Sequence, residues 1–176
     1  MSGIRQLINP RTERYNQFKS IIKSEQFNWN RNPRMGVTPF MFSHSFLRRP
    51  DLLKYPSVQS DGAKFAYDEL EEILNYNDIK HYCYYRIHLN MVIPQEGNQR
   101  TPMHVDHWDY DLKKKQFPHW NMLVYFSNEG KTILENGEHD PEEDDVIIFP
   151  GLPHCQELPK NDMRLVLVAT CITSKL

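Results

Sequence analysis

The chain has 176 residues, of which 39% are hydrophobic and 25% charged, as is usual for a folded globular protein. Its formal net charge of −2 excludes the strongly basic field that drives non-specific nucleic-acid binding. No run approaches the roughly 18 apolar residues of a membrane-spanning helix, and the N-terminus lacks the apolar region of a secretion signal. We therefore expect one domain over residues 1–176, located in the cytoplasm, with neither nucleic-acid nor membrane partners.

The three cysteines, Cys83, Cys155 and Cys171, are an odd number and too few for a disulfide scaffold. No pair has the C-x-x-C spacing of a zinc knuckle or a redox dithiol. We expect reduced, buried thiols, as in a cytosolic protein.

The first 80 residues are predicted to contain two helices. The first lies within 11–24, with Tyr15, Phe18, Ile21 and Ile22 on one side, and 27–51 should form short strands and loops. The second lies within 60–78, where Ser60 or Asp61 can serve as the N-cap. Its apolar residues recur at helical spacing, at Ala63, Ala66, Leu70, Ile73 and Leu74, and Glu69, Glu71 and Glu72 should lie on or beside the opposite face. Such a helix would support a sheet.

From His81 onward the pattern has the period of two that indicates β-strands. One face of the first strand should carry Cys83, Tyr85, Ile87, Leu89 and Met91, and the other Tyr82, Tyr84, Arg86, His88 and Asn90. Further strands are predicted within 121–128, 131–136, 144–150 and 163–172, separated by turns rich in glycine and proline. The sequence predicts a mainly β protein, a jelly-roll barrel with N-terminal helices, in which residues 1–80 give helical support and 81–176 form the barrel core.

The segment MHVDHWD suggests a metal site. On a strand, His104 and Asp106 point to the same side. His154 follows 50 residues later, after a predicted strand and turn, which is enough chain to return to the facing strand of an antiparallel barrel. Two imidazoles and one carboxylate suit iron(II) and leave three adjacent positions of an octahedral ion open. The alternative is that H-x-D marks an exposed turn or a hydrogen-bonded core histidine.

Arg164 stands ten residues after His154, at the start of an otherwise apolar strand. A guanidinium is costly to bury there unless it meets an anion, and it matches a carboxylate in two parallel hydrogen bonds. The alternative is an arginine at the mouth of the strand, in water or paired with Asp162.

Taken together, H-x-D, the distal histidine and the arginine resemble the Fe(II)/2-oxoglutarate dioxygenases, in particular the compact prolyl-hydroxylase-like and phage-encoded members. The resemblance covers about residues 84–172. It implies a double-stranded β-helix (a cupin-like jelly roll) and hydroxylation by O2 with release of succinate and CO2 from 2-oxoglutarate. By position, it implies that His104, Asp106 and His154 are the metal ligands and that Arg164, Asn90 and Tyr125 bind the cosubstrate; it also implies ascorbate as a candidate reductant.

The sequence leaves two local details open. Alternation turns either Asn121, Leu123 and Tyr125 or Met122, Val124 and Phe126 inward. The family often has two glycines before the next strand, whereas NEGKT contains only Gly130, which questions the turn geometry there. Because Asp106 fills the position that halide takes in halogenases, hydroxylation is the expected outcome.

The substrate is predicted only by class, as a peptidyl proline, another side chain or a small molecule. Trp108 and Tyr110 either hold this substrate or close the end of the barrel, and His88 is interpreted as a satisfied core residue. Two rival functions remain: a cupin-type metal enzyme that does not use 2-oxoglutarate, and a catalytically silent jelly-roll binding module. The sequence indicates no oligomeric state.

Overall fold

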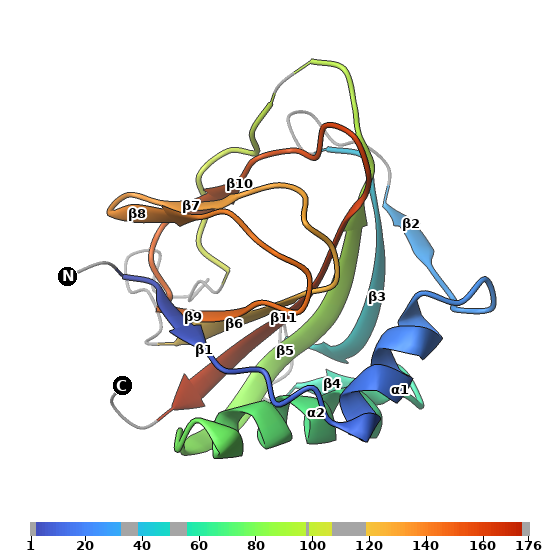
Figure 1. The fold of residues 1–176 in the computed structure, drawn as a ribbon, viewed down its shortest axis with the longest axis vertical. Helices are drawn as coiled ribbons and strands as arrows, with labels where there is room; N and C mark the ends of the chain where they lie inside the picture. The colour runs from blue at the N-terminus through green and yellow to red at the C-terminus, as the bar shows by residue number, and fades with distance from the viewer. Residues whose placement is uncertain (1–2, 33–38, 50–55, 98, 107–118, 174–176) are drawn as a thin grey trace.

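The computed structural model describes residues 3–32, 39–49, 56–97, 99–106 and 119–173 (Figure 1). Its two helices are α1 (Glu13–Ile22) and α2 (Ala63–Tyr76). The first strands are β1 (Arg5–Leu7), β2 (Asn30–Asn32), β3 (Met41–Arg48), β4 (Ser57–Val58), β5 (His81–Val92) and β6 (Trp120–Tyr125). The remaining strands are β7 (Thr132–Leu134), β8 (Gly137–His139), β9 (Val146–Pro150), β10 (His154–Gln156) and β11 (Arg164–Thr173).

The strands form two antiparallel sheets. The large sheet has the order β1-β9-β6-β11-β5-β3-β2, with β4 paired to β3, and the small sheet has the order β10-β7-β8. In Figure 1 the small sheet lies across one face of the curved large sheet, and both helices lie on the other face. The prediction of a mainly β jelly roll with N-terminal helices is confirmed.

The first 80 residues also contribute strands to the large sheet. β1 pairs with β9 at one edge, and β3 pairs with β5 and carries β2 at the other. The N-terminal part of the chain therefore extends the sheet on both sides as well as covering it. None of the described helices is long and apolar enough to cross a membrane.

Both helices form where they were predicted, with local differences. Thr12 is the N-cap of α1, and its side chain accepts a hydrogen bond from the backbone of Tyr15. The predicted N-cap of α2 at Ser60 or Asp61 is wrong, because Gly62 takes that position without a side-chain bond. Ser60 instead bonds the backbone N–H of Gly62 in the turn before the helix. Ile21, predicted on the apolar face of α1, is 48% exposed.

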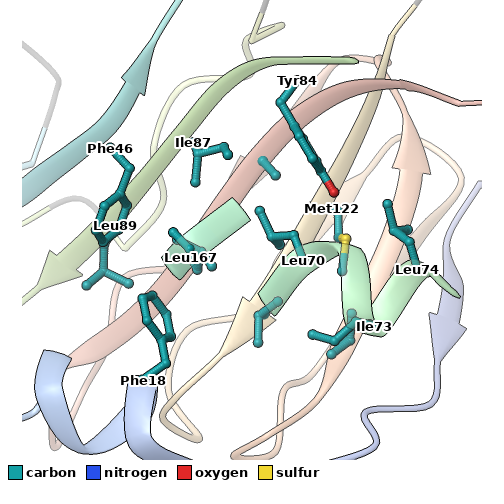
Figure 2. Packing of buried hydrophobic residues seen from close by; sticks show 14 of the residues in the cluster. Phe18, Phe46, Leu70, Ile73, Leu74, Tyr84, Ile87, Leu89, Met122 and Leu167 are labelled. Carbon is teal, nitrogen blue, oxygen red and sulfur yellow. The ribbon is translucent and has the colours of Figure 1, made fainter. Parts of the chain in front are cut away.

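The main hydrophobic core lies between the helices and the large sheet. Figure 2 shows Phe18 of α1 and Leu70 of α2 packed over Leu89 of β5 and Leu167 of β11. A second cluster on the opposite face of the sheet includes Tyr125, Phe149 and Val166. The large sheet is therefore apolar on both faces, with the second cluster under the small sheet.

A β-bulge changes the predicted faces of β5. Along β11, Thr170 pairs with Arg86 and the next residue, Cys171, pairs with Tyr84, so Tyr85 is the extra residue. Tyr84 consequently joins the main core instead of sharing a face with Arg86. Cys83 is exposed, so the prediction that all three thiols are buried is wrong for this residue.

The helical pattern also predicts the wrong environment for Glu69. It was expected on or beside the polar face of α2, but it is 0% exposed, and neither carboxylate oxygen has a hydrogen-bond partner among the described residues. Burial, followed by the charge of Glu72, raises its pKa to about 7. The carboxyl group is therefore neutral in the folded protein at mildly acidic pH.

Glu69 should make the folded protein less stable as pH rises. A folded-state pKa of about 7 against 4.5 for the free group means that its contribution is complete below pH 4.5 and is lost as pH rises through 7. The loss amounts to about 3 kcal/mol, and Glu69→Gln should remove this pH dependence. Urea unfolding between pH 5 and 8 measures it, with Glu25→Gln, at an exposed position, as the control. If the free energy of unfolding changed equally with pH in wild type and Glu69→Gln, the raised pKa of Glu69 would be contradicted.

Candidate metal centre

His104, Asp106 and His154 lie together and line the same cavity. His104 and His154 form an antiparallel bridge in which each backbone N–H donates to the other carbonyl over 2.9 Å. Asp106 follows His104 by two residues. One potential ligand atom from each of the three residues lies within 4.8 Å of the others. The chain thus returns to the H-x-D segment after 50 residues, as the sequence suggested.

Both histidines are held so that the same ring nitrogen is available. Nδ1 of His104 lies 3.1 Å from the carbonyl oxygen of Pro102, and Nδ1 of His154 lies 2.9 Å from that of Leu152. A carbonyl only accepts, so each Nδ1 carries the proton. Nε2 of each ring then presents its lone pair, which is the form of imidazole that binds a metal.

Asp106 supplies the third donor from a buried position. Its Oδ1 accepts a hydrogen bond from Arg86 over 3.2 Å, and its backbone carbonyl accepts one from Arg49 over 2.6 Å. Its Oδ2 lies 3.4 Å from Nε2 of His154 and has no hydrogen-bond partner among the described residues. Nε2 of His104 lies 4.0 Å from Oδ1. A buried carboxylate with one unbonded oxygen, close to two imidazole nitrogens, fits a divalent metal ion.

Electrostatics keep this carboxylate ionised. Burial opposes ionisation, but the contact with His154 and the positive charge of Arg86 together lower the pKa of Asp106 well below its usual value. Burial likewise lowers the pKa of His154, and the carboxylate of Asp106 more than compensates, so the net shift is upward. In the metal-free protein Asp106 is therefore a ready anionic donor.

The three residues open onto a cavity of about 550 Å³ between the sheets. Its lining includes Asn90 of β5, Leu123 of β6, Thr132 of β7, and Val168 and Arg164 of β11. This volume is in the range of small-molecule sites, and the walls combine apolar and polar side chains.

Arg164 reaches this cavity from the first position of β11. It is 2% exposed; its Nε donates to the carbonyl of Gly130 over 3.0 Å and its Nη2 to Oγ1 of Thr132 over 3.1 Å. Within the described part of the chain, no carboxylate lies within 4.0 Å of the guanidinium, and Asp162 bonds the backbone of Met163 instead. Burial lowers the pKa of Arg164. A buried cation with neutral partners that faces a cavity is chemically suited to bind an anion.

The structure also gives the inward face of β6. Leu123 and Tyr125 face the small sheet, whereas Met122 and Val124 pack under the helices. The hydroxyl of Tyr125 lies 2.6 Å from Oγ1 of Thr132, and the Arg164 guanidinium lies 5.5 Å from its ring centre. Tyr125 therefore belongs to the surroundings of Arg164.

Thr132 was missed by the sequence reasoning. It is 2% exposed and links the Tyr125 hydroxyl to the Arg164 guanidinium. The only signal was a threonine at the start of a short predicted strand, and its direction depends on how the small sheet packs on the large one.

Asn90 and His88 lie side by side in the cavity wall. The Asn90 amide nitrogen is 3.0 Å from Nε2 of His88, and Nη2 of Arg86 is 2.9 Å from the same atom. Because both neighbours are donors, this nitrogen accepts and His88 is neutral with its proton on Nδ1. Burial lowers the pKa of His88 well below its usual value, in agreement with this form. His88 is thus only partly satisfied, since its Nδ1 has no partner among the described residues.

The single glycine of NEGKT is required by Arg164. Gly130 has φ +76°, and a Cβ there would lie 2.6 Å from Cδ of Arg164 and from the carbonyl oxygen of Glu157. One glycine therefore suffices for the turn, because it both adopts the left-handed backbone and leaves room for the arginine.

Gly130→Ala should destabilise the fold by about 1–3 kcal/mol through backbone strain and overpacking. The shift in the urea midpoint measures this. Gly137→Ala is the matched control, since no atom lies within 4 Å of its Cβ position, and it should change stability by less than about 0.5 kcal/mol. Equal effects of the two substitutions would refute the steric role of Gly130.

The candidate substrate contacts Trp108 and Tyr110 lie outside the described residues.

No family model and no curated protein matches the sequence. Solved structures do match. An oxidoreductase of the 2OG-Fe(II) oxygenase family from Burkholderia pseudomallei aligns with a TM-score of 0.63 and 11% identity over 97% of this chain and 85% of its own. A Pseudomonas putida prolyl-4-hydroxylase aligns with a TM-score of 0.56 and 14% identity over 99% and 95%. The viral collagen prolyl hydroxylase of Paramecium Bursaria Chlorella virus-1 gives 0.56 and 14% over 98% and 96%.

At sequence identities this low, the similarity shows the fold alone. The alignments cover most of both chains in each case. The chain therefore has the double-stranded β-helix fold of the 2OG-Fe(II) oxygenase structures.

Proposed function

We propose that this protein is an Fe(II)- and 2-oxoglutarate-dependent oxygenase. The observation that carries the proposal is that Arg164, a buried arginine without a described carboxylate partner, shares one cavity with a two-histidine, one-carboxylate cluster. A dicarboxylate with an oxoacid end requires both features, a metal for chelation at one end and a cation at the other.

Each group has a distinct role in this proposal. His104, Asp106 and His154 hold the iron, which supplies the activation of dioxygen when bound. Arg164 binds the distal carboxylate of 2-oxoglutarate through its guanidinium, and the Tyr125 hydroxyl donates a further hydrogen bond. Asn90, in the cavity wall, contributes an amide near the same ligand.

The remaining lining residues orient the cosubstrate and exclude water. Leu123 and Val168 give the cavity apolar surface. With little water present, the attraction between the guanidinium and a carboxylate is much stronger than it would be at the protein surface. Thr132 keeps the guanidinium and the Tyr125 hydroxyl in fixed positions, so that ordering them costs little when the ligand binds.

The reaction outcome we propose is hydroxylation of a side chain or small molecule, with release of succinate and CO2. Two of the three structures named above are prolyl hydroxylases, which makes a peptidyl proline the first substrate to test. The substrate would enter beside β3, where Ser43 and Ser45 line the cavity.

The two rival functions explain fewer of these features. A cupin-type enzyme without 2-oxoglutarate gives no role to the buried Arg164. A silent binding module gives no role to His104 and His154. Backbone carbonyls hold the Nδ1 atoms of both rings, which leaves both Nε2 atoms available.

Turnover in air tests the proposal. Purified protein with Fe(II), ascorbate and 2-oxoglutarate should form succinate slowly without a substrate, and faster with a proline-containing peptide or another accepted substrate. His104→Ala should form none. Absence of succinate from the wild-type protein under all these conditions, with iron bound, would contradict the proposed function.

A further inference from the structure

Two arginines hold Asp106 from different directions. Nη1 of Arg86, on β5, donates to the side-chain Oδ1 over 3.2 Å. Nη1 of Arg49, just after β3, donates to the backbone carbonyl over 2.6 Å. The side chain and the main chain of this one residue are thus fixed by separate groups, so removing one arginine leaves the other contact in place.

The Arg86 side chain is itself anchored at its other nitrogen. Nη2 lies 2.9 Å from Nε2 of His88, which is 5% exposed and also accepts from the Asn90 amide. His88 is neutral in this arrangement, because both of its neighbours at Nε2 are donors. The guanidinium cannot move away from Asp106 without also losing its contact with this buried acceptor.

The two carboxylate oxygens of Asp106 are therefore not equivalent. Oδ1 accepts the hydrogen bond from Arg86 and lies 4.0 Å from Nε2 of His104, whereas Oδ2 has no hydrogen-bond partner among the described residues and lies 3.4 Å from Nε2 of His154. A free carboxylate can bind a metal through one oxygen or through both. Binding through both would use one of the three open positions that a 2-oxoacid and dioxygen need.

We propose that Arg86 is a positioning residue that restricts Asp106 to one metal-binding oxygen and so keeps three coordination positions open. The need for three open positions rests on the proposed function. The effect of Arg86 on how Asp106 binds a metal does not. It comes with a consequence that a purely structural ion pair would not have. A fixed positive charge beside the metal repels it, so Arg86 weakens metal binding while making the bound metal more accessible.

Metal titration separates these two effects. The full chain, stripped of metal, is titrated with Co(II), and the Co(II)-loaded protein is then titrated with 2-oxoglutarate in the absence of air. Relief of charge repulsion in Arg86→Met should tighten Co(II) binding about tenfold. Its affinity for 2-oxoglutarate should fall at least about tenfold, as one position is taken by the second oxygen of Asp106.

Two further variants serve as controls. Arg86→Lys keeps the charge and should bind Co(II) within about threefold of wild type. Arg5→Met makes the same change as Arg86→Met at an exposed position of β1 and should leave both affinities unchanged.

Weaker or unchanged Co(II) binding by Arg86→Met would overturn the inference, because loss of a merely structural contact predicts that result. Equal tightening in Arg86→Lys would also overturn it. A wild-type protein that binds Co(II) but no 2-oxoglutarate would refute the proposed function, while the Co(II) affinities of the variants would still decide the role of Arg86.

Discussion

Arg164→Met is expected to weaken 2-oxoglutarate binding by at least about 100-fold and, at the same time, to stabilise the ligand-free protein. The loss of affinity follows from two charge-assisted hydrogen bonds to the distal carboxylate, each of about 1.5–3 kcal/mol. The gain in stability follows because the guanidinium is buried with only neutral hydrogen-bond partners among the described residues. Replacing such a cation by an apolar side chain of similar length should stabilise the fold by about 1–2 kcal/mol.

Calorimetric titration of 2-oxoglutarate and urea unfolding of the ligand-free protein measure the two effects. Arg164→Lys keeps the charge but loses the paired geometry, so its affinity should lie between those of wild type and Arg164→Met. A destabilised Arg164→Met protein with unchanged affinity would show that Arg164 is a structural residue, and the cosubstrate assignment would be wrong.

His154→Ala is expected to abolish detectable iron binding at micromolar concentrations. Only His104, which is half-exposed, and Asp106 would remain, and Asp106 would keep Arg86 as its partner. A group that only bonds a ligand typically changes metal affinity by about 10- to 100-fold, so loss of one of the three ligands themselves should weaken iron binding on the order of 1000-fold. Anaerobic equilibrium dialysis against Fe(II) provides the measurement.

His81→Ala is the matched control for this substitution. His81 begins β5 and pairs with Glu71 of α2, away from the cavity-lining residues. Its iron affinity should equal that of wild type. If His154→Ala retained one tightly bound iron per chain, the metal site would have to lie elsewhere.

Much of the site could be predicted because it depends on local regularities. Strand alternation explains why His104 and Asp106 point the same way, and an antiparallel return explains why His154 meets them. The apolar surroundings of Arg164 in the sequence already indicated a buried cation. These features need only the period of a strand and the reach of the chain.

The remaining features depend on irregularities and on packing between distant segments. The bulge at Tyr85 reverses the face of Tyr84, and no residue type in the sequence marks a bulge there. Glutamate usually lies at the surface, yet Glu69 is 0% exposed in the folded protein. Thr132 and Arg86 become part of the site only because the small sheet closes over the large one (Figure 1).

In the proposed function, iron and 2-oxoglutarate bind together in one cavity. Fe(II) and 2-oxoglutarate, added to the purified protein without oxygen, should produce the weak visible charge-transfer band of the chelate. That band should be absent in His104→Ala and should need far more 2-oxoglutarate to appear in Arg164→Ala. An iron-loaded wild-type protein that shows no band at saturating 2-oxoglutarate would contradict the claim.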